Sequence, residues 1–475
     1  MAQRIGLRLD LVVGGAALVF VGIATAVGLF VPNIFAGAPP LFAEWLPHVG
    51  IGTPLAVLIA VAVIAWRPPL LLAYPLAVAW TFSLALVDGW QRGIADRLTS
   101  KDEYLHEVPG VTDIGAMLRS FSARILDFQP DSWTTHVAGH PPGALLVFVW
   151  LDRLGLGGGA WAGVVVILIG SLTAFAVPWT IRSLANADLA ATPHLPRWLA
   201  PAAAPRPSRS PGRVSPLRSG PGAVSIHSLS RGGAAPWLLR SASRPSADYA
   251  ELASAAVPFS ILLPGAVWVG VSADGLFAGV TALAVGLLVQ RHWSAWIAGG
   301  LLLGYSVFLS YGLLLFGLVA LAAVAATRRW AALIVALVAA LAIVVAFAAA
   351  GFWWFDGYHL VVERYYQGIG ALRPYSYWVW ADLAALVLAA GPAAVAGLRR
   401  LPGSPLLLIT GAALLAILLA DVTGLSKAEV ERIWLPFTVW LVPAAALLPA
   451  STRRWWLAAQ ALTALAVNHL VLTNW

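Results

Sequence analysis

Apolar runs of about 20 residues recur along the whole chain, and no other feature limits its fold as strongly. Hydrophobic residues make up 60% of the 475 residues and charged residues only 11%, whereas soluble domains carry roughly 25% charged residues. Inside a bilayer, only α-helices and closed barrels satisfy all backbone hydrogen bonds. Uninterrupted runs of this length therefore predict an all-α polytopic membrane protein.

The apolar runs predict about 13 transmembrane helices. Arginines such as Arg182 and the pair Arg399 and Arg400 mark alternate ends of these runs. The positive-inside rule places the marked ends in the cytoplasm, so residues 88–158 and 352–377 are expected outside. The expected spans are 9–31, 50–66, 69–87, 159–181, 252–271, 275–290, 293–310, 312–327, 330–351, 378–397, 404–420, 433–450 and 455–473.

The apolar stretch 141–154 does not fit this alternation as a span. It is short and carries Asp152 and Arg153 near its end. If it crossed the membrane, every later arginine cluster would face the wrong side. We therefore expect a hairpin or a re-entrant piece.

The net charge of +8 comes almost entirely from arginine, because Lys101 and Lys427 are the only lysines. The arginines lie mainly in pairs at segment ends, where they set topology, so the charge does not indicate nucleic-acid binding. The absence of cysteine excludes disulfides, thiolate catalysis and Cys-ligated metals. The bias towards Arg, Ala, Gly and Pro is typical of a GC-rich bacterial genome, so the expected location is a bacterial plasma membrane.

Residues 182–250 differ from the rest of the chain. They are rich in Pro, Ser and Ala and contain nine arginines against the two acids Asp188 and Asp248. Such a composition cannot bury enough apolar surface to fold. It predicts a disordered cytoplasmic loop that is attracted to anionic headgroups. The loop separates an N-terminal membrane part, 1–181, from a C-terminal membrane part, 251–475.

Residues 88–143 form an acid-rich segment between apolar runs and contain eight of the chain's 21 acidic residues. Within it, Asp102 and Glu103 are adjacent, so their side chains point apart and do not form a matched acid and base pair. One of them could serve as a general base in a partly desolvated interface. A solvated charged loop is the alternative interpretation.

An amphipathic helix is predicted for residues 112–126. From Ile114 to Ile125, apolar residues recur at helical spacing, while polar residues cover the other face. Thr112 is the expected N-cap. Such a helix would lie in the membrane interface with its apolar face down and would line a pocket at headgroup level.

A His-Pro-Pro sequence leads into the next apolar run. His136 and His140 are four residues apart, but Gly139, Pro141 and Pro142 argue against a shared helical face. A metal site formed by the two histidines is therefore not expected. His140 is expected to orient a ligand or to contact a phosphate.

In their order and spacing, Asp-Glu-Tyr at 102–104, the predicted helix 112–126 and His-Pro-Pro-Gly at 140–143 resemble the GT-C superfamily of integral-membrane glycosyltransferases. Members of that superfamily take sugar from a polyprenyl-phosphate donor at the outer face of the membrane. The stretch 256–280 is similar to the family's span that ends in proline and is followed by an external acid, here Asp274. The chain departs from the family in having two extra helices before the acidic loop and in its arginine-rich insert.

The resemblance implies roles for the acidic segment. Asp102 would be the catalytic base, with Asp88 as the alternative, and Glu103 belongs to the same catalytic group. Tyr104 and His140 would bind the substrate. The resemblance also allows a divalent metal ion, Mg²⁺ or Mn²⁺, near the acids, although the sequence contains no clear set of three ligands.

The second polar segment, 352–377, contains a further predicted interfacial helix with His359 and Arg364, followed by Arg373. Arginines outside contradict the positive-inside rule, and an anionic ligand would explain them, because arginine makes bidentate contacts to phosphate. Arg364 could instead pair with a neighbouring acid. Arg373 has no acid close in sequence, which favours phosphate binding.

Glu431 and Arg432 lie where the next apolar run begins. An ionisable residue at the start of a membrane span indicates a functional site. The two could pair with each other, or Arg432 could hold the donor phosphate and Glu431 a sugar hydroxyl.

The sequence therefore predicts a membrane glycosyltransferase that moves a sugar from a polyprenyl-phosphate donor to a glycan or lipid acceptor in synthesis of the cell envelope. Membrane lipids are the expected surroundings. The alternative function is a polytopic transporter or lipid flippase, for which Asp274 and Asp382 would be the residues of interest. A non-enzymatic membrane scaffold is a third interpretation.

Overall fold

The computed structural model describes residues 2–34, 40–191 and 245–472 of the chain. About 74% of the described residues are helical, and no strand occurs among them, so the predicted all-α class is confirmed. The predicted disordered loop 182–250 lies mostly outside the described residues. At its two edges, however, the chain is helical, because the flanking helices continue to residue 191 and begin at residue 245.

The described residues form α-helices that are joined by turns and short 3₁₀ segments. Along the chain the helices are α1 (Ala2–Gly28), α2 (Thr53–Trp66), α3 (Ala73–Ala85), α4 (Ile114–Ser120), α5 (Thr135–Ala138), α6 (Pro142–Arg153), α7 (Gly159–Gly170), α8 (Thr173–Ala191), α9 (Pro245–Ile261), α10 (Ala266–Val269), α11 (Ala273–Leu288), α12 (Trp293–Ser306), α13 (Gly317–Thr327), α14 (Trp330–Ala349), α15 (Trp354–Gln367), α16 (Tyr375–Ala390), α17 (Pro392–Leu398), α18 (Leu407–Thr423), α19 (Val430–Ile433), α20 (Leu435–Thr438) and α21 (Arg453–Leu470).

Four helical stretches within the described residues are long and apolar enough to cross a membrane: Gly6–Gly28, Leu70–Asp88, Gly159–Ala185 and Trp330–Ala349. The bent pair of α16 and α17 gives a fifth. Other apolar helices, such as α2, α11 and α18, have only 10–17 residues. At about 1.5 Å per residue they fall short of the roughly 30 Å hydrocarbon core. The structure thus has four to five candidate spans, and the predicted number of about 13 stays a prediction.

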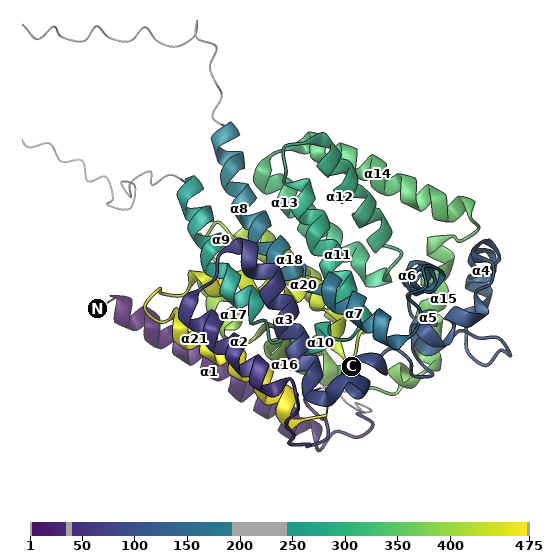
Figure 1. Ribbon diagram of the computed structural model, residues 1–475, viewed down its shortest axis with the longest axis horizontal. Helices are drawn as coiled ribbons and strands as arrows, with labels where there is room; N and C mark the ends of the chain where they lie inside the picture. The colour runs from purple at the N-terminus through teal and green to yellow at the C-terminus, as the bar shows by residue number, and fades with distance from the viewer. Residues whose placement is uncertain (1, 35–39, 192–244, 473–475) are drawn as a thin grey trace, which may run out of the picture.

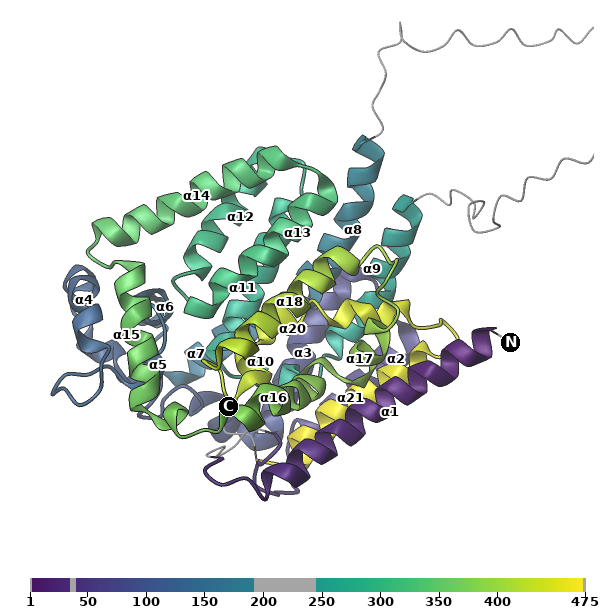
Figure 2. The same ribbon diagram turned by 180° about the vertical axis from the view of Figure 1, so that it is seen from behind.

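The helices of the N-terminal and C-terminal parts pack against one another. α8 packs on α9 and α11, α3 packs on α9, and α2 packs on α21. α1 contacts α16 and α17, and it runs along one flank of the molecule beside α21 (Figures 1 and 2). The two predicted membrane parts therefore share one helical body.

The break between α16 and α17, a bend of 110°, has a local cause. Gly391 has a φ of +87°, which favours glycine, and a Cβ there would lie 1.9 Å from the side-chain oxygen of Gln460. Gln460 is fully buried. Its amide nitrogen donates to the carbonyl of Ala390 at 3.0 Å, and its oxygen accepts from the backbone of Ala393 at 3.1 Å. One side chain on α21 therefore satisfies both ends of the interrupted helix.

The two ends of the body differ in character. The N-terminus of α1 and the free ends of α8 and α9 lie at one end, and α4, α5 and α15 lie at the other (Figures 1 and 2). At the first end, Arg399 and Arg400 both pair with the buried carboxylate of Asp10, with an Arg400–Asp10 distance of 2.6 Å. Arg329 donates to the carbonyl of Val289 at 2.6 Å where α11 and α14 meet. Several of the predicted arginine clusters are thus held by other helices.

The predicted interfacial helix is shorter than expected. α4 covers only seven residues and is capped by Asp113, whose carboxylate accepts from the backbone of Ala116 at 3.1 Å, so the prediction of Thr112 as the N-cap is wrong. Its apolar face packs on the protein: Phe121 is fully buried, with its ring centroid 5.5 Å from that of Phe352. The partner side chains come from a segment about 230 residues later, which local periodicity cannot reveal.

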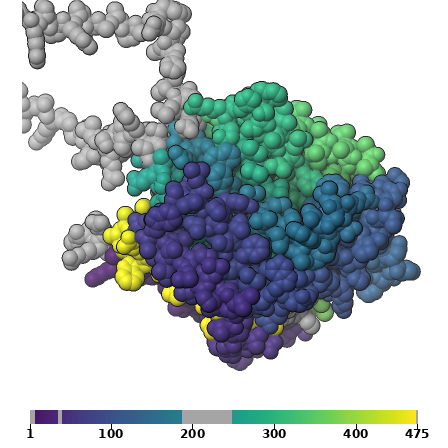
Figure 3. Space-filling model, in the orientation of Figure 1, coloured from purple at the N-terminus to yellow at the C-terminus, as the bar shows by residue number. Residues whose placement is uncertain are grey.

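α6 corresponds to the apolar stretch 141–154, which is expected not to cross the membrane. It has 12 residues, or about 18 Å of helix, which is too short to cross the hydrocarbon core. It begins at Pro142 directly after the extended Pro141, as the proline pair predicts. Residues around α6 form part of the blue surface in Figure 3, below the green of α14.

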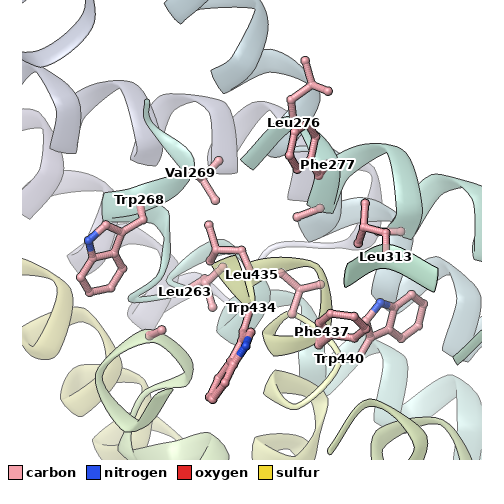
Figure 4. Close-up of a cluster of buried hydrophobic side chains, with 14 of the residues drawn as sticks. Leu263, Trp268, Val269, Leu276, Phe277, Leu313, Trp434, Leu435, Phe437 and Trp440 are labelled. Carbon is pink, nitrogen blue, oxygen red and sulfur yellow. The ribbon is translucent and has the colours of Figure 1, made fainter. Parts of the chain in front are cut away.

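A core of large side chains lies between α10, α11 and the chain around α20 (Figure 4). Trp268 from α10, Phe277 from α11, and Trp434, Leu435 and Trp440 around α20 are all at most 2% exposed (Figure 4). Full burial of such a side chain is worth about 1.5–3 kcal/mol. This packing fixes the chain directly after α19 and so helps to position the charged residues that α19 carries.

Candidate functional site

The loop that carries Asp102 is attached to α5. The backbone N–H of His136 donates to the carbonyl of Asp102 at 2.9 Å, and the hydroxyl of Thr135 donates to the Asp102 carboxylate at 3.0 Å. Asp102 itself is exposed. These contacts bring an accessible carboxylate next to the His-Pro-Pro segment, as the sequence analysis predicts for a site.

His136 connects this loop to Arg432. Its Nδ1 lies 3.0 Å from the carboxylate of Glu103, and its Nε2 lies 3.2 Å from a guanidinium nitrogen of Arg432. Arginine only donates hydrogen bonds, so the Arg432 contact requires an unprotonated Nε2. The proton of the neutral ring then sits on Nδ1 and faces Glu103.

Arg432 is the centre of a buried charged network. Its guanidinium pairs with Asp274 at 2.8 Å and with Glu429 at 2.7 Å. The second oxygen of Glu429 pairs with Arg373 at 2.8 Å. Both arginine side chains are only 7–8% exposed. Residues that are up to 330 positions apart in the sequence, from Glu103 to Arg432, are therefore linked through direct contacts.

The segment before α19 holds Arg373 from both sides. The Arg373 guanidinium donates to the carbonyl of Lys427 at 2.6 Å, and the Lys427 ammonium donates to the carbonyl of Arg373 at 3.0 Å. Ala428 and Glu429 follow with φ values of 66° and 63°. A left-handed backbone at non-glycine residues costs on the order of 1–3 kcal/mol each and persists only where the surroundings enforce it. Here the ion pairs of Glu429 supply that constraint.

The network shifts the pKa values of its members. Burial alone would raise the pKa of Glu429, but Arg432 and Arg373 outweigh it and lower the value to about 2. Burial likewise opposes the charge of Glu103, and the contact with His136 lowers the pKa of that carboxyl below its ordinary value. For His136, burial is outweighed by Glu103, so the pKa of the ring is raised. The network therefore favours the ionised forms of Glu429 and Glu103.

Aromatic rings fix the orientation of the histidines. The ring of Tyr104, which is 1% exposed, stacks on His136 at 6.2 Å and on Phe148 at 5.2 Å between centroids. His140 lies 5.7 Å from both Tyr104 and Phe277, and its Nδ1 bonds to the carbonyl of His136 at 2.8 Å. Burial lowers the pKa of His140 and favours the neutral ring. Tyr104 thus packs against the two histidine rings and helps to fix their orientation.

Most of the predicted site residues meet here. Glu431, on α19 beside Arg432, is fully buried. The predicted residues in this part of the molecule are Asp102, Glu103, Tyr104, His140, Asp274, Arg373, Glu431 and Arg432.

Asp88 lies in a different group of charges. Its carboxylate pairs with His48 at 2.9 Å and with Arg97 at 2.8 Å, and it also contacts Arg92. The Asp88 side chain is only 4% exposed. The side chain of Asp88 is thus engaged by three donors and buried, whereas Asp102 is exposed, which favours Asp102 as the candidate base.

His359 and Arg364 on α15 are separate from the charged network. Arg364 pairs with Asp127 at 2.7 Å, an acid far away in the sequence. His359 and Asp356 line an open hollow of about 490 Å³ together with Ser122. For Arg364, an ion pair therefore explains the charge without a phosphate.

Sequence reasoning overlooked three members of the network. The sequence suggests for His136 only a metal-ligand role, which it disfavours, and it gives Glu429 and Lys427 no role. The signal for Glu429 was present in the spacing Glu429-Val430-Glu431-Arg432, in which two acids precede one arginine. Only the fold shows that Glu429 bridges Arg432 and Arg373.

The described residues contain no group of three His, Asp or Glu side chains that could hold a metal ion. In the network, Glu103, Asp274 and Glu429 already have cationic or histidine partners. As placed, these carboxylates do not fit a divalent metal.

No protein-family model, curated protein or solved structure matches the chain. An exposed carboxylate on the loop that reaches Arg432 through His136 can accept a proton, while the guanidinium groups of Arg432 and Arg373 can hold an anion.

Proposed function

We propose that the protein is a glycosyltransferase that moves a sugar from a polyprenyl-phosphate donor to an acceptor hydroxyl. The observation that supports this best is the convergence of Arg373 and Arg432 with the loop that carries Asp102. Arginine matches the geometry of phosphate oxygens, and an exposed carboxylate suits a general base. The order of motifs that resembles the GT-C superfamily supports the same reaction.

In the proposed reaction the acceptor oxygen forms a bond to C1 of the sugar, and the bond from C1 to the phosphate oxygen breaks. Asp102 takes the proton of the acceptor hydroxyl. The phosphate leaves with the electron pair, and Arg373 and Arg432 stabilise its additional charge. Glu103 and His136 hold Arg432 in place. A single displacement of this kind inverts the configuration at C1.

We place the site at the outer face of a bacterial plasma membrane, with a glycan or lipid as acceptor and membrane lipids around the helices. The arginine-rich ends of α1 and α17 lie away from the end with α4, α5 and α15, which fits the positive-inside rule (Figure 1). A chain with about 13 crossings, some of them by short or broken helices, is compatible with this orientation.

The proposal is tested by sugar transfer in liposomes that contain the purified full chain. Radiolabelled glucose, mannose and arabinose on polyprenyl phosphate serve as donors, with an envelope extract as the acceptor. Asp102→Asn should reduce transfer about 100-fold or more, because general base catalysis contributes at least that factor. Asp131→Asn is the control, since the side chain of Asp131 is 68% exposed. Transfer by Asp102→Asn near the wild-type rate would exclude Asp102 as the base.

Transport is the second candidate function. α16 and α17 meet at 110°, and α16 carries the buried Asp382. Broken helices with charged groups near them occur in transporters. A flux of the intact lipid-linked sugar that depends on a pH gradient, without formation of a new glycosidic bond, would favour transport over transfer.

A further inference from the structure

We infer that Glu429 is a resident anion in the donor-phosphate site, and that the phosphate of the donor must displace its carboxylate to bind. This inference rests on the proposed function and adds a control element to the same site. Glu429 would then decide how readily lipid-linked phosphates bind.

The contacts of Glu429 are those that a phosphodiester would make. One carboxylate oxygen lies 2.8 Å from Arg373, and the other lies 2.7 Å from Arg432. A phosphodiester also presents two equivalent oxygens that share a single negative charge. Arginine recognises both groups through the same N–H geometry. The carboxylate therefore occupies the position between the guanidinium groups that the phosphate needs.

Glu429 is also better placed to leave than the other acid that contacts Arg432. Its side chain is 19% exposed, whereas that of Asp274 is 5% exposed and lies in the first turn of α11. Glu429 follows Ala428 in a left-handed backbone, with φ values of 63° and 66°. A rotation of this segment would relieve the unfavourable backbone conformation as the ion pairs break. Asp274 would remain as the permanent partner of Arg432.

The exchange conserves charge between the two arginines. When the Glu429 carboxylate moves out, one negative charge is lost from the position between Arg373 and Arg432, and a phosphodiester replaces it with one negative charge. The apparent dissociation constant is the intrinsic constant divided by the fraction of molecules with an open site. Occupation by Glu429 therefore weakens binding of every phosphate ligand.

The test measures binding of farnesyl methyl phosphate, a phosphodiester, to the full chain in detergent. In Glu429→Gln the side chain keeps its size, but its NH₂ group cannot accept from a guanidinium. We expect this variant to bind the probe roughly tenfold or more tightly than the wild type. Glu363→Gln, at an exposed glutamate on α15, is the matched control and should bind like the wild type. Equal or weaker binding by Glu429→Gln would overturn the inference.

A second variant covers the case in which Glu429→Gln does not fold. Glu429→Asp keeps the charge but shortens the side chain, so that it cannot reach both arginines, and it should also bind the probe more tightly. Binding equal to that of the wild type would overturn the inference. Tighter binding without sugar transfer by the wild type would reject the proposed function alone. Transfer by the wild type without tighter binding in either variant would reject only the role of Glu429.

Discussion

At the scale of single residues, Asp102 and Glu103 are neighbours that have different surroundings. Asp102 is exposed and accepts a hydrogen bond from Thr135 at 3.0 Å. The side chain of Glu103 is only 12% exposed and lies 3.0 Å from His136. The first is available to a substrate proton, and the second holds the ring of His136 through its Nδ1. Two adjacent carboxylates can therefore have separate roles.

The pKa of Glu429 gives a prediction about stability. The pKa of this group is lowered from 4.5 to about 2 in the folded protein, so its contribution to stability is complete above pH about 4.5. It is lost as the pH falls towards 2, and its size is at most about 3 kcal/mol. The melting temperature should therefore fall more steeply in the wild type than in Glu429→Gln as the pH is lowered from 5 to 2.5. Parallel pH profiles would contradict the ion pairs of Glu429.

At the scale of helices, breaks bring the charged residues together. α5 is one turn long, and α19 ends where Trp434 and α20 enter the core, so neither is a regular span. α16 ends at Gly391 because the chain turns there against Gln460. Such interruptions leave backbone groups without helical partners, and side chains must replace them.

Gln460→Leu tests this replacement. The substitution keeps the approximate volume but leaves the N–H of Ala393 and the carbonyl of Ala390 without their buried partner. We expect a loss of at least about 2 kcal/mol in the free energy of unfolding. Gln129→Leu, at an exposed position, is the control and should change stability little. A stability of Gln460→Leu equal to that of the wild type would show that Gln460 does not support the break.

At the scale of the whole molecule, the proposed site requires that distant segments face the same side of the membrane. The loop with Asp102 and the start of α16 with Arg373 meet through Glu429 and Arg432. The arginine-rich ends lie at the other end of the body (Figures 1 and 2). One orientation in the bilayer can satisfy both observations.

Single cysteines test this orientation, because the natural chain has none. Ser100→Cys, close to Asp102, and Ser376→Cys, close to Arg373, replace exposed serines at one end, while Ser451→Cys replaces one just before α21. In intact cells a membrane-impermeant maleimide should label the first two variants and not the third. After permeabilisation it should label all three. If only one of the first two variants were labelled in intact cells, the segments with Asp102 and Arg373 would face opposite sides of the membrane, which would contradict a shared site.

The sequence was sufficient for the helical class, for the polar segments and for most of the residues that meet in the site. Composition and periodicity are properties of local sequence, and they predicted α15 and the proline-initiated α6. Partners from distant segments could not be predicted in this way. The pairs of Arg364 with Asp127 and of Arg373 with Glu429 depend on how helices pack. For the same reason, the apolar face of α4 was assigned to lipid although it packs against protein.

The most direct test of the account is an experimental structure of the full chain with a non-transferable sugar phosphodiester of a polyprenol. We expect the phosphate between Arg373 and Arg432, with the Glu429 carboxylate displaced and C1 of the sugar facing Asp102. A headgroup bound elsewhere, for example beside His48 and Asp88, with the Arg373–Glu429–Arg432 contacts intact, would contradict it.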